Sequence, residues 1–214
     1  MNIVQFDEFC NEKFQLQARE QKIRDQRKRP VIPTSSIVKS IREMPVLGQR
    51  SLLRVDQYAR SEGAKKWHGS VKEDMVVSDS TLPRVLEGLQ REPVVQIPYE
   101  VVLELDKEKY WDWKLPTGRK VRAAGITDGS CFGGFWASVL TLAGASEAVV
   151  DLEPYRTRGD ELPASRRLMK RANEKLGREF FDLVLADGLS PTHEDFRLYR
   201  QELGSDLLVK TREE

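Results

Sequence analysis

The feature that most constrains the fold is a short, uninterrupted apolar run at residues 183–186, which stops at Asp187 and Gly188. A continuous apolar run of this length, bounded by a turn signal, is typical of a strand that is buried on both faces of a sheet. Asp187 would then lie at the carboxyl end of the strand. In open α/β sheets that rim is where ligands bind.

A second stretch repeats the pattern. Residues 121–129 read VRAAGITDG, which predicts a strand ending at Asp128. Between the two acids the sequence predicts strands at 135–142 and 148–152 and a helix that begins at Asp160. After them it predicts a helix opened by a capping box of Thr192 and Asp195, and a last strand at 207–210. The expected fold is mixed α/β, with the order β-β-β-α-β-α-β.

This order determines whether the two acids meet. Three strands joined by short connections form an antiparallel meander, so the third runs parallel to the first. A right-handed crossover can then lay the fourth strand beside the first and parallel to it. The carboxyl ends of these two strands, and with them Asp128 and Asp187, would be neighbours.

The front of the chain reads as helical. Residues 1–29 predict a helix that Pro30 ends, and shorter helices follow around Ile37, over 51–60 and near Pro83. These short helices fit either a helix-turn-helix unit or a small helical bundle. With residues 92–98 as a connector, the boundary is placed near residue 100. This gives a helical domain at 1–100, which could bind DNA, and an α/β domain at 101–214.

Charge gives little indication of a partner. The net charge is +1, so the chain as a whole does not indicate a nucleic-acid binder. A basic run before Pro30 could contact phosphates, although a solvated charged surface is an equal alternative. Lys210 could likewise contact a phosphate or simply end an edge strand. The candidate DNA-binding residues are therefore Arg24, Arg27, Lys28, Arg29 and Lys210.

The cysteines and the hydropathy indicate a compartment. Two cysteines, Cys10 and Cys131, can form neither a disulfide framework nor a four-ligand zinc site. No apolar stretch is long enough to span a membrane, and no signal peptide opens the sequence. We therefore expect a cytoplasmic protein that does not associate with membranes.

Two neighbouring aspartates imply a cation. Ionised carboxylates about 4 Å apart repel by roughly 4 kcal/mol at an effective dielectric constant near 20. Hard oxygen ligands without histidine or cysteine favour Mg²⁺ or Mn²⁺. Such ions can activate a water and stabilise the leaving oxygen of a phosphodiester. The alternative is that each Asp-Gly is an ordinary turn.

From residue 121 onward the chain resembles the catalytic domain of DDE transposases encoded by bacterial insertion sequences. The matching stretches are ITDGSCFGGFW, RGDELPASRRLMKR and FFDLVLADGLSPTHEDFRLYRQELGSDLLVK. The resemblance implies an RNase H-like core in which Asp128 and Asp187 are catalytic and bind Mg²⁺ or Mn²⁺. It also implies double-stranded DNA partners (transposon ends and target DNA), a homodimer in the synaptic complex, and a nucleoid-associated location when on DNA.

The resemblance has one departure. The family's third acid is a glutamate on a helix well beyond the last strand predicted here, and Glu213 and Glu214 come too early to replace it. A truncated or degenerate transposase, or a fragment of a longer one, is therefore expected to transpose poorly. The alternative function is a DNA-binding protein without cleavage activity. An unrelated aspartate-based phosphatase ranks last, because Asp128 lacks a second aspartate two positions on.

Overall fold

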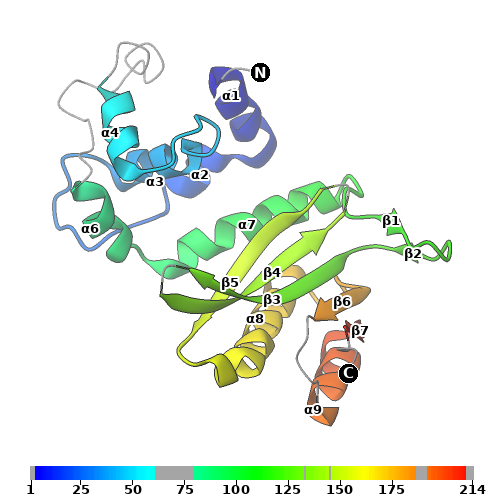
Figure 1. Ribbon diagram of the computed structural model, residues 1–214. Coiled ribbons are helices and arrows are strands. Elements are labelled where there is room, and N and C mark those ends of the chain that lie inside the picture. The colour runs from blue at the N-terminus through cyan, green and yellow to red at the C-terminus, as the bar shows by residue number, and fades with distance from the viewer. Residues whose placement is uncertain (1–2, 61–79, 133, 145, 187–191, 211–214) are drawn as a thin grey trace. The chain divides into compact units, whose positions relative to one another are not determined.

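The structure is a computed structural model of the chain that describes residues 3–60, 80–132, 134–144, 146–186 and 192–210. The chain divides into two compact units, Met1–Ile97 and Pro98–Glu214 (Figure 1). The sequence placed this boundary near residue 100.

The N-terminal unit is helical. Its helices are α1 (Ile3–Phe14), α2 (Leu16–Glu20), α3 (Thr34–Glu43), α4 (Leu52–Ala59) and α6 (Thr81–Glu87). The single helix expected over residues 1–29 is wrong, because Gln15 has the left-handed φ of 52° and separates α1 from α2. The helix then ends at Glu20, so most of the basic run lies outside it.

Three of these helices share one hydrophobic core. Ile37 of α3, Val55 of α4, and Leu82 and Val85 of α6 are buried together. Apolar side chains from successive helical turns meet in this way when amphipathic helices pack face to face. Of the two alternatives that the sequence left open, this packing fits the small helical bundle.

Helix α7 (Arg91–Asp106) replaces the connector that was expected at residues 92–98. Pro98 lies inside it, although an interior proline costs about 3 kcal/mol. The turn after Pro98 offsets this cost with buried contacts. Tyr99 is fully buried and donates a 2.8 Å hydrogen bond to Asp151, and Trp111 Nε1 donates to the Val102 carbonyl at 3.1 Å.

The C-terminal unit is mixed α/β, as the sequence predicted. Its five-stranded sheet has the order β5-β4-β3-β6-β7. The strands are β3 (Ala124–Phe132), β4 (Phe135–Ala143), β5 (Ala148–Tyr155), β6 (Leu183–Ala186) and β7 (Asp206–Val209). β3, β4 and β5 pair antiparallel, whereas β6 runs parallel to β3 and to β7. A separate two-stranded hairpin joins β1 (Trp113–Lys114) to β2 (Lys120–Val121).

Helix α8 (Glu161–Leu176) packs along one face of this sheet (Figure 1). Its buried stripe includes Leu168, Met169 and Ala172, which recur at the spacing of an amphipathic helix. Between β6 and β7 the chain forms α9 (His193–Arg197) and a π-helical turn, Leu198–Leu203. Within the described residues, no helix combines the length and the apolar character needed to cross a bilayer.

Candidate functional site

The parallel pairing of β3 with β6 positions the candidate site. Its register runs from Ala124 opposite Leu183 to Thr127 opposite Ala186. The crossover predicted from the element order is therefore present, and the two strands are neighbours. Asp128 is the next residue on β3 and is exposed. Asp187 follows Ala186 in the sequence but lies outside the described residues, so the pairing of the two acids stays a prediction.

The predicted end of the first strand at Asp128 is wrong. β3 continues to Phe132, where it pairs with Phe135 of β4, and the two phenyl rings stack with centroids 5.5 Å apart. The antiparallel partner is as long as β3, so the ladder continues past Asp128. On the other side of β3 the described pairing with β6 stops at Thr127. Asp128 is therefore interior to one ladder and lies just beyond the end of the other.

An ion pair fixes the chain that follows the undescribed residues 187–191. Arg166 of α8 donates to both carboxylate oxygens of Asp195, at 2.6 and 3.0 Å. Asp195 also accepts from the backbone and the hydroxyl of Thr192, which confirms the predicted capping box. Asp195 is 2% exposed, and the Arg166 guanidinium and Thr192 hold the pKa of this carboxyl low against the effect of burial.

A small pocket opens beside the β3–β6 pair. Its lining includes Thr127, Ala186, Ser165 and Tyr199. Burial raises the pKa of the Tyr199 hydroxyl to about 12, which keeps it protonated at neutral pH. The pocket measures about 20 Å³, which is room for one ordered water. The pocket is therefore too small for a substrate as large as a nucleotide.

A second carboxylate approaches β3 from α8, and the sequence reading had missed it. Glu161 is the first residue of α8, and its carboxylate lies against Gly129, the residue after Asp128. A Cβ on Gly129 would be 2.8 Å from Oε2 of Glu161 and closer still to Oε1. The carboxylate occupies the space that any larger residue at position 129 would fill. The sequence signal was the glycine after Asp128, which was read only as a turn.

Tyr155, at the end of β5, faces the same place. It is 7% exposed. Burial raises the pKa of this hydroxyl, and the negative charges of Glu161 and Asp128 and a hydrogen bond with Glu161 raise it further.

The donors at this edge of the sheet suit a hard cation, although they do not complete a site. Within the described part of the chain there is no group of three or more histidine, cysteine or acidic side chains that could hold a metal ion. The carboxylates of Asp128 and Glu161 are oxygen donors of the kind that Mg²⁺ and Mn²⁺ prefer. Residues that could hold a metal here are therefore Asp128 and Glu161, and by prediction Asp187.

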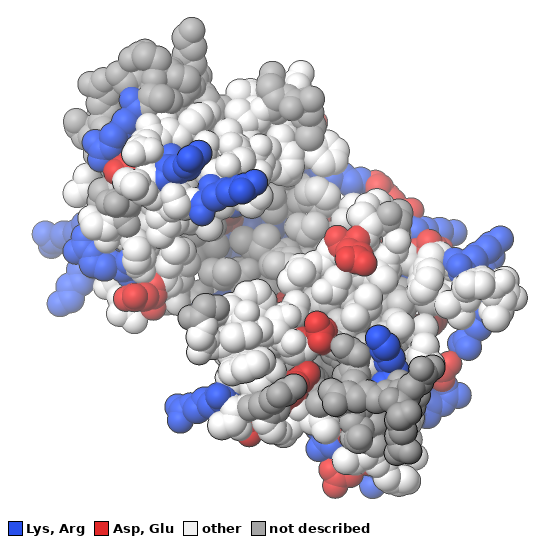
Figure 2. Space-filling view, viewed as in Figure 1, with Lys and Arg blue, Asp and Glu red and all other residues white. Residues whose placement is uncertain are grey.

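The basic side chains of α8 have partners within the unit. Arg171 bonds to Asp151 at 2.7 Å and to Glu153 at 2.8 Å, and Arg167 bonds to Glu153 at 2.9 Å. Figure 2 shows basic and acidic side chains interspersed on the visible face of the C-terminal unit, at lower right. These arginines stabilise the packing of α8 against β5.

The candidate DNA-binding residues of the N-terminal unit fall into two kinds. Arg27 is tied to Asp25 by three hydrogen bonds of 2.7–3.0 Å, and Arg24 donates to the carbonyls of Gln21 and Ile23. Lys28 and Arg29 are exposed and have no side-chain contact among the described residues. These last two could meet a phosphate without first losing a partner.

Lys210 lies at the end of β7. Its backbone N–H donates to the Ala186 carbonyl at 3.3 Å, and its side chain is exposed. The residue therefore continues the ladder beside β6 by one hydrogen bond. Its side chain lies on the same edge of the sheet as the end of β6, which is compatible with either of its two predicted roles.

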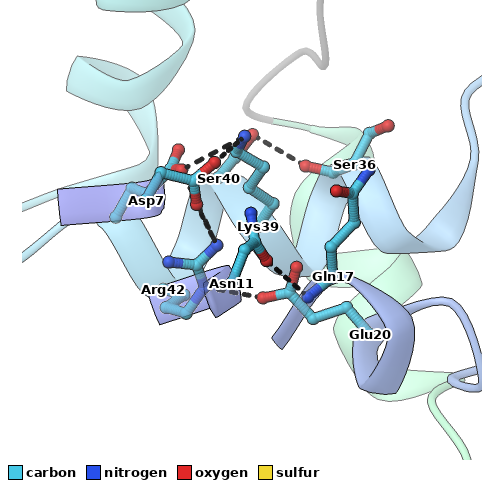
Figure 3. Close-up of polar contacts among 9 residues, drawn as sticks. Asp7, Asn11, Gln17, Glu20, Ser36, Lys39, Ser40 and Arg42 are labelled. Carbon is cyan, nitrogen blue, oxygen red and sulfur yellow. Dashed lines mark hydrogen bonds and ion pairs between the residues drawn. The ribbon is translucent and has the colours of Figure 1, made fainter. Parts of the chain in front are cut away.

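A cluster of buried ionisable side chains lies in the N-terminal unit, at the contact of α1, α2 and α3 (Figure 3). Arg42 donates to Glu20 at 2.6 Å and to Asp7 at 2.8 Å, and Lys39 donates to Asp7 at 2.6 Å. Glu43 is fully buried, and its nearest cationic nitrogens, on Lys39 and Arg42, are 3.8 Å away. Every member has an ionic neighbour within the unit, so this cluster is structural.

Comparisons with known proteins add no identification. No protein-family model, curated protein or solved structure matches the chain. The resemblance to DDE transposases therefore stays a prediction from the sequence stretches that carry it.

Proposed function

We propose that the chain carries out metal-dependent phosphodiester chemistry on DNA, as a transposase of the DDE class. The observation that carries the proposal is the parallel register of β3 and β6, in which Thr127 lies opposite Ala186. Asp128 directly follows the first of these residues and Asp187 directly follows the second. Because consecutive Cα atoms are about 3.8 Å apart, chain connectivity limits how far the two acids can be from each other.

The fold supports the same proposal. Three antiparallel strands, a crossover helix and two further parallel strands produce the order β5-β4-β3-β6-β7. We interpret this arrangement as an RNase H-like core. In it the first acid would come from the central strand β3 and the second from the residue after β6, next to the last described pair, Thr127 with Ala186.

The chemistry follows from the donors. A divalent ion held there would supply Lewis acidity and an activated water for attack on phosphorus. The exposed carboxylate of Asp128 would hold such an ion by charge and by a hard oxygen. A DNA backbone would have to bind outside the pocket beside the β3–β6 pair, because that pocket has room only for water. Arg166 would keep the segment after Asp187 anchored through Asp195.

The test is metal-dependent nicking of supercoiled plasmid by the purified chain in Mn²⁺ or Mg²⁺. We expect slow nicking that falls at least about a hundredfold in Asp128→Asn and in Asp187→Asn, because each change removes a charged metal ligand. Asp206→Asn is the matched control. Asp206 is a carboxylate of the same sheet whose partners are Arg119 and Arg200, so nicking should persist.

Equal loss in all three variants would indicate damage to the sheet and would contradict the assignment. Nicking that survives in both Asp128→Asn and Asp187→Asn would show that other groups perform the chemistry. Efficient joining of transposon ends by this chain alone would contradict the expectation that it transposes poorly.

A second candidate function is DNA binding without cleavage. It is favoured by the exposed side chains of Lys28 and Arg29, which have no hydrogen bond or ion pair among the described residues. Binding of double-stranded DNA that weakens with salt, together with no nicking in either metal, would select it.

In the transposase proposal the DNA-bound form is a homodimer on two DNA ends, which light scattering of the DNA complex would detect.

A further inference from the structure

We propose that a surface pocket of the N-terminal unit binds a backbone phosphate of double-stranded DNA, with Arg84 as the principal contact. The pocket measures about 430 Å³ and is lined by Asp25, Gln26, Arg27, Arg84, Glu87 and Gly88. Its volume lies in the range of about 300–1,000 Å³ that is usual for ligand sites. The inference rests on the proposed function, in which DNA is the partner, and deepens it by assigning a contact that no sequence pattern indicated.

The loop on one side of the pocket is held by hydrogen bonds to α3 and to the chain after α6. The Asp25 carboxylate accepts from the backbone N–H of Arg27 at 2.8 Å and from the hydroxyl of Thr34, the first residue of α3, at 2.7 Å. The Arg24 carbonyl accepts from the backbone N–H of Gln90 at 3.0 Å. The pocket is therefore preformed, so a ligand does not have to order the loop when it binds.

Arg84 of α6 supplies hydrogen-bond donors that are not used within the unit. Its side chain is exposed, and among the described residues its only bond runs from Nε to the Ser80 carbonyl, at 3.2 Å. A guanidinium carries N–H donors on all of its nitrogens, so both terminal nitrogens of Arg84 remain available. Two such donors can bind two oxygens of one phosphate in parallel, which is the geometry that arginine favours.

The charges around the pocket favour an anion. Asp25 opposes it little, because its side chain is 2% exposed and is hydrogen-bonded to Arg27, which lowers the pKa of Asp25 to about 2. Glu87 is exposed and does oppose an anion, but Arg84 and the exposed basic residues at 28–29 outnumber it. Because this positive charge continues along the loop past the pocket, it suits a phosphate within a polymer better than a free phosphate.

The test is binding of the full chain to a fluorescently labelled duplex of about 20 base pairs, followed by anisotropy over a series of salt concentrations. We expect Arg84→Gln to weaken binding about tenfold and to reduce the slope of log affinity against log salt by about one, because one phosphate contact is lost. Arg54→Gln is the matched control, since Arg54 is an exposed arginine of α4 that does not line the pocket. Its affinity should stay within about twofold of the unmodified chain.

Two further variants test the pocket itself. Glu87→Gln removes the opposing carboxylate, so we expect affinity to rise about twofold, which is the scale of an exposed charge interaction. Gly88→Leu places an apolar side chain in the pocket without changing any charge, and we expect it to weaken binding as Arg84→Gln does.

Gly88→Ala is the control for the filled pocket. Gly88 has a φ of −94°, which other residues also adopt. A Cβ there would meet Gln26 and the Arg84 carbonyl at the ordinary contact distances of 3.5 and 3.6 Å. The fold and the binding should therefore persist in Gly88→Ala, and circular dichroism of both Gly88 variants would verify the fold.

The outcomes separate this inference from the proposed function. If the unmodified chain binds the duplex and Arg84→Gln and Gly88→Leu bind it equally well, the pocket is not a phosphate site and the proposed function stands. If the chain binds no duplex even at low salt, both proposals are overturned. If Arg54→Gln loses as much affinity as Arg84→Gln, the effect is general charge and the inference is wrong.

Calorimetric titration with ATP distinguishes the two sources of a phosphate. We expect weak binding or none, because a free nucleotide does not reach the basic residues that continue the loop. A dissociation constant for ATP below about 10 μM, lost in Arg84→Gln, would assign the pocket to a free nucleotide and overturn the inference.

Discussion

The carboxylate of Glu43 in the N-terminal unit and those of Asp195 and Asp151 in the C-terminal unit are buried in different ways. In the N-terminal unit Glu43 is fully buried, and neither of its carboxylate oxygens has a hydrogen-bond partner among the described residues. Lys39 and Arg42 attract it only from 3.8 Å. Burial raises the pKa of Glu43 to about 8 against this attraction.

The C-terminal unit surrounds its buried carboxylates with donors. Asp195 accepts two bonds from Arg166 and two from Thr192, and its pKa is lowered although burial alone would raise it. Asp151 accepts from Tyr99, from Arg171 and, through its other oxygen, from the Leu152 backbone N–H.

The difference shows that hydrogen-bond geometry, and not burial alone, decides whether the pKa of a buried carboxylate is raised or lowered. A carboxylate whose lone pairs are all used remains charged when buried, because hydrogen bonds replace the water it has lost. A carboxylate attracted only from a distance takes up a proton. The Asp195 cluster should therefore contribute less stability in acid, and the Glu43 cluster should contribute less in alkali.

The strongest test of this comparison removes a hydrogen-bond donor from the Asp195 cluster. Arg166→Ala leaves Asp195 buried without its cation, and breaking a buried pair in this way costs about 3 kcal/mol. We expect the free energy of unfolding of the C-terminal unit to fall by that order. Denaturant unfolding, followed by hydrogen exchange in β6, β7 and α8, measures it.

Lys170→Ala is the control for that prediction. Lys170 lies one helical turn from Arg166, and its pair with Glu202 is 3.8 Å long with both side chains 57% exposed. Exposed pairs of this kind contribute less than about 1 kcal/mol. A loss in Lys170→Ala equal to that in Arg166→Ala would mean that charge on α8 matters in general and that the buried geometry does not.

The next test is the pH dependence of the N-terminal unit. The folded pKa of Glu43 lies above its unfolded value of 4.5, so its contribution to stability is complete below pH 4.5 and is lost as the pH rises through 8. We expect the unit to lose about 1–3 kcal/mol between pH 5 and pH 9. Hydrogen exchange in α3, compared with β5 at each pH, measures this loss.

Glu43→Gln should remove most of that dependence, because glutamine has no charge to bury. The other ionic groups around Glu43 do not reverse this loss of stability between pH 5 and pH 9. The pKa of Glu20 is raised, as that of Glu43 is. The pKa of Asp7 is lowered, so it matters only in acid, and the pKa of Tyr58 is raised from 10, so it matters only in stronger alkali. A slope in Glu43→Gln as steep as in the unmodified chain would contradict the assignment.

The sequence predicted the topology of the C-terminal unit because its signals were local. The apolar run at β6 and the capping box at Thr192 and Asp195 each depend on a few adjacent residues. Right-handed crossover then required β6 to lie beside β3. The true length of β3 was missed because it depends on β4, which pairs with it as far as Phe132.

The candidate site was predicted only in part for the same reason. Asp128 was predicted because it follows an apolar stretch, whereas Gly129 was interpreted only as a turn residue. The surroundings of Gly129 depend on Glu161, which is 32 positions further along the chain. No local pattern links those two residues, since the contact exists only once α8 packs on the sheet. Helix α7 was missed because Pro98 was weighed without the burial of Tyr99.

The smallest expected effect tests how complete the Asp151 cluster is. Tyr99→Phe removes one of its donors and leaves the Arg171 bond at 2.7 Å in place. Because the carboxylate keeps a cation and a backbone donor, we expect a loss of only about 1 kcal/mol, the usual net value of one hydrogen bond. Thermal unfolding would show it as a fall in Tm of roughly 4–8 °C for a unit of this size. A loss near that of Arg166→Ala would mean that Tyr99, and not Arg171, is the main partner of Asp151, and the contrast between the two clusters would then rest on hydroxyl donors.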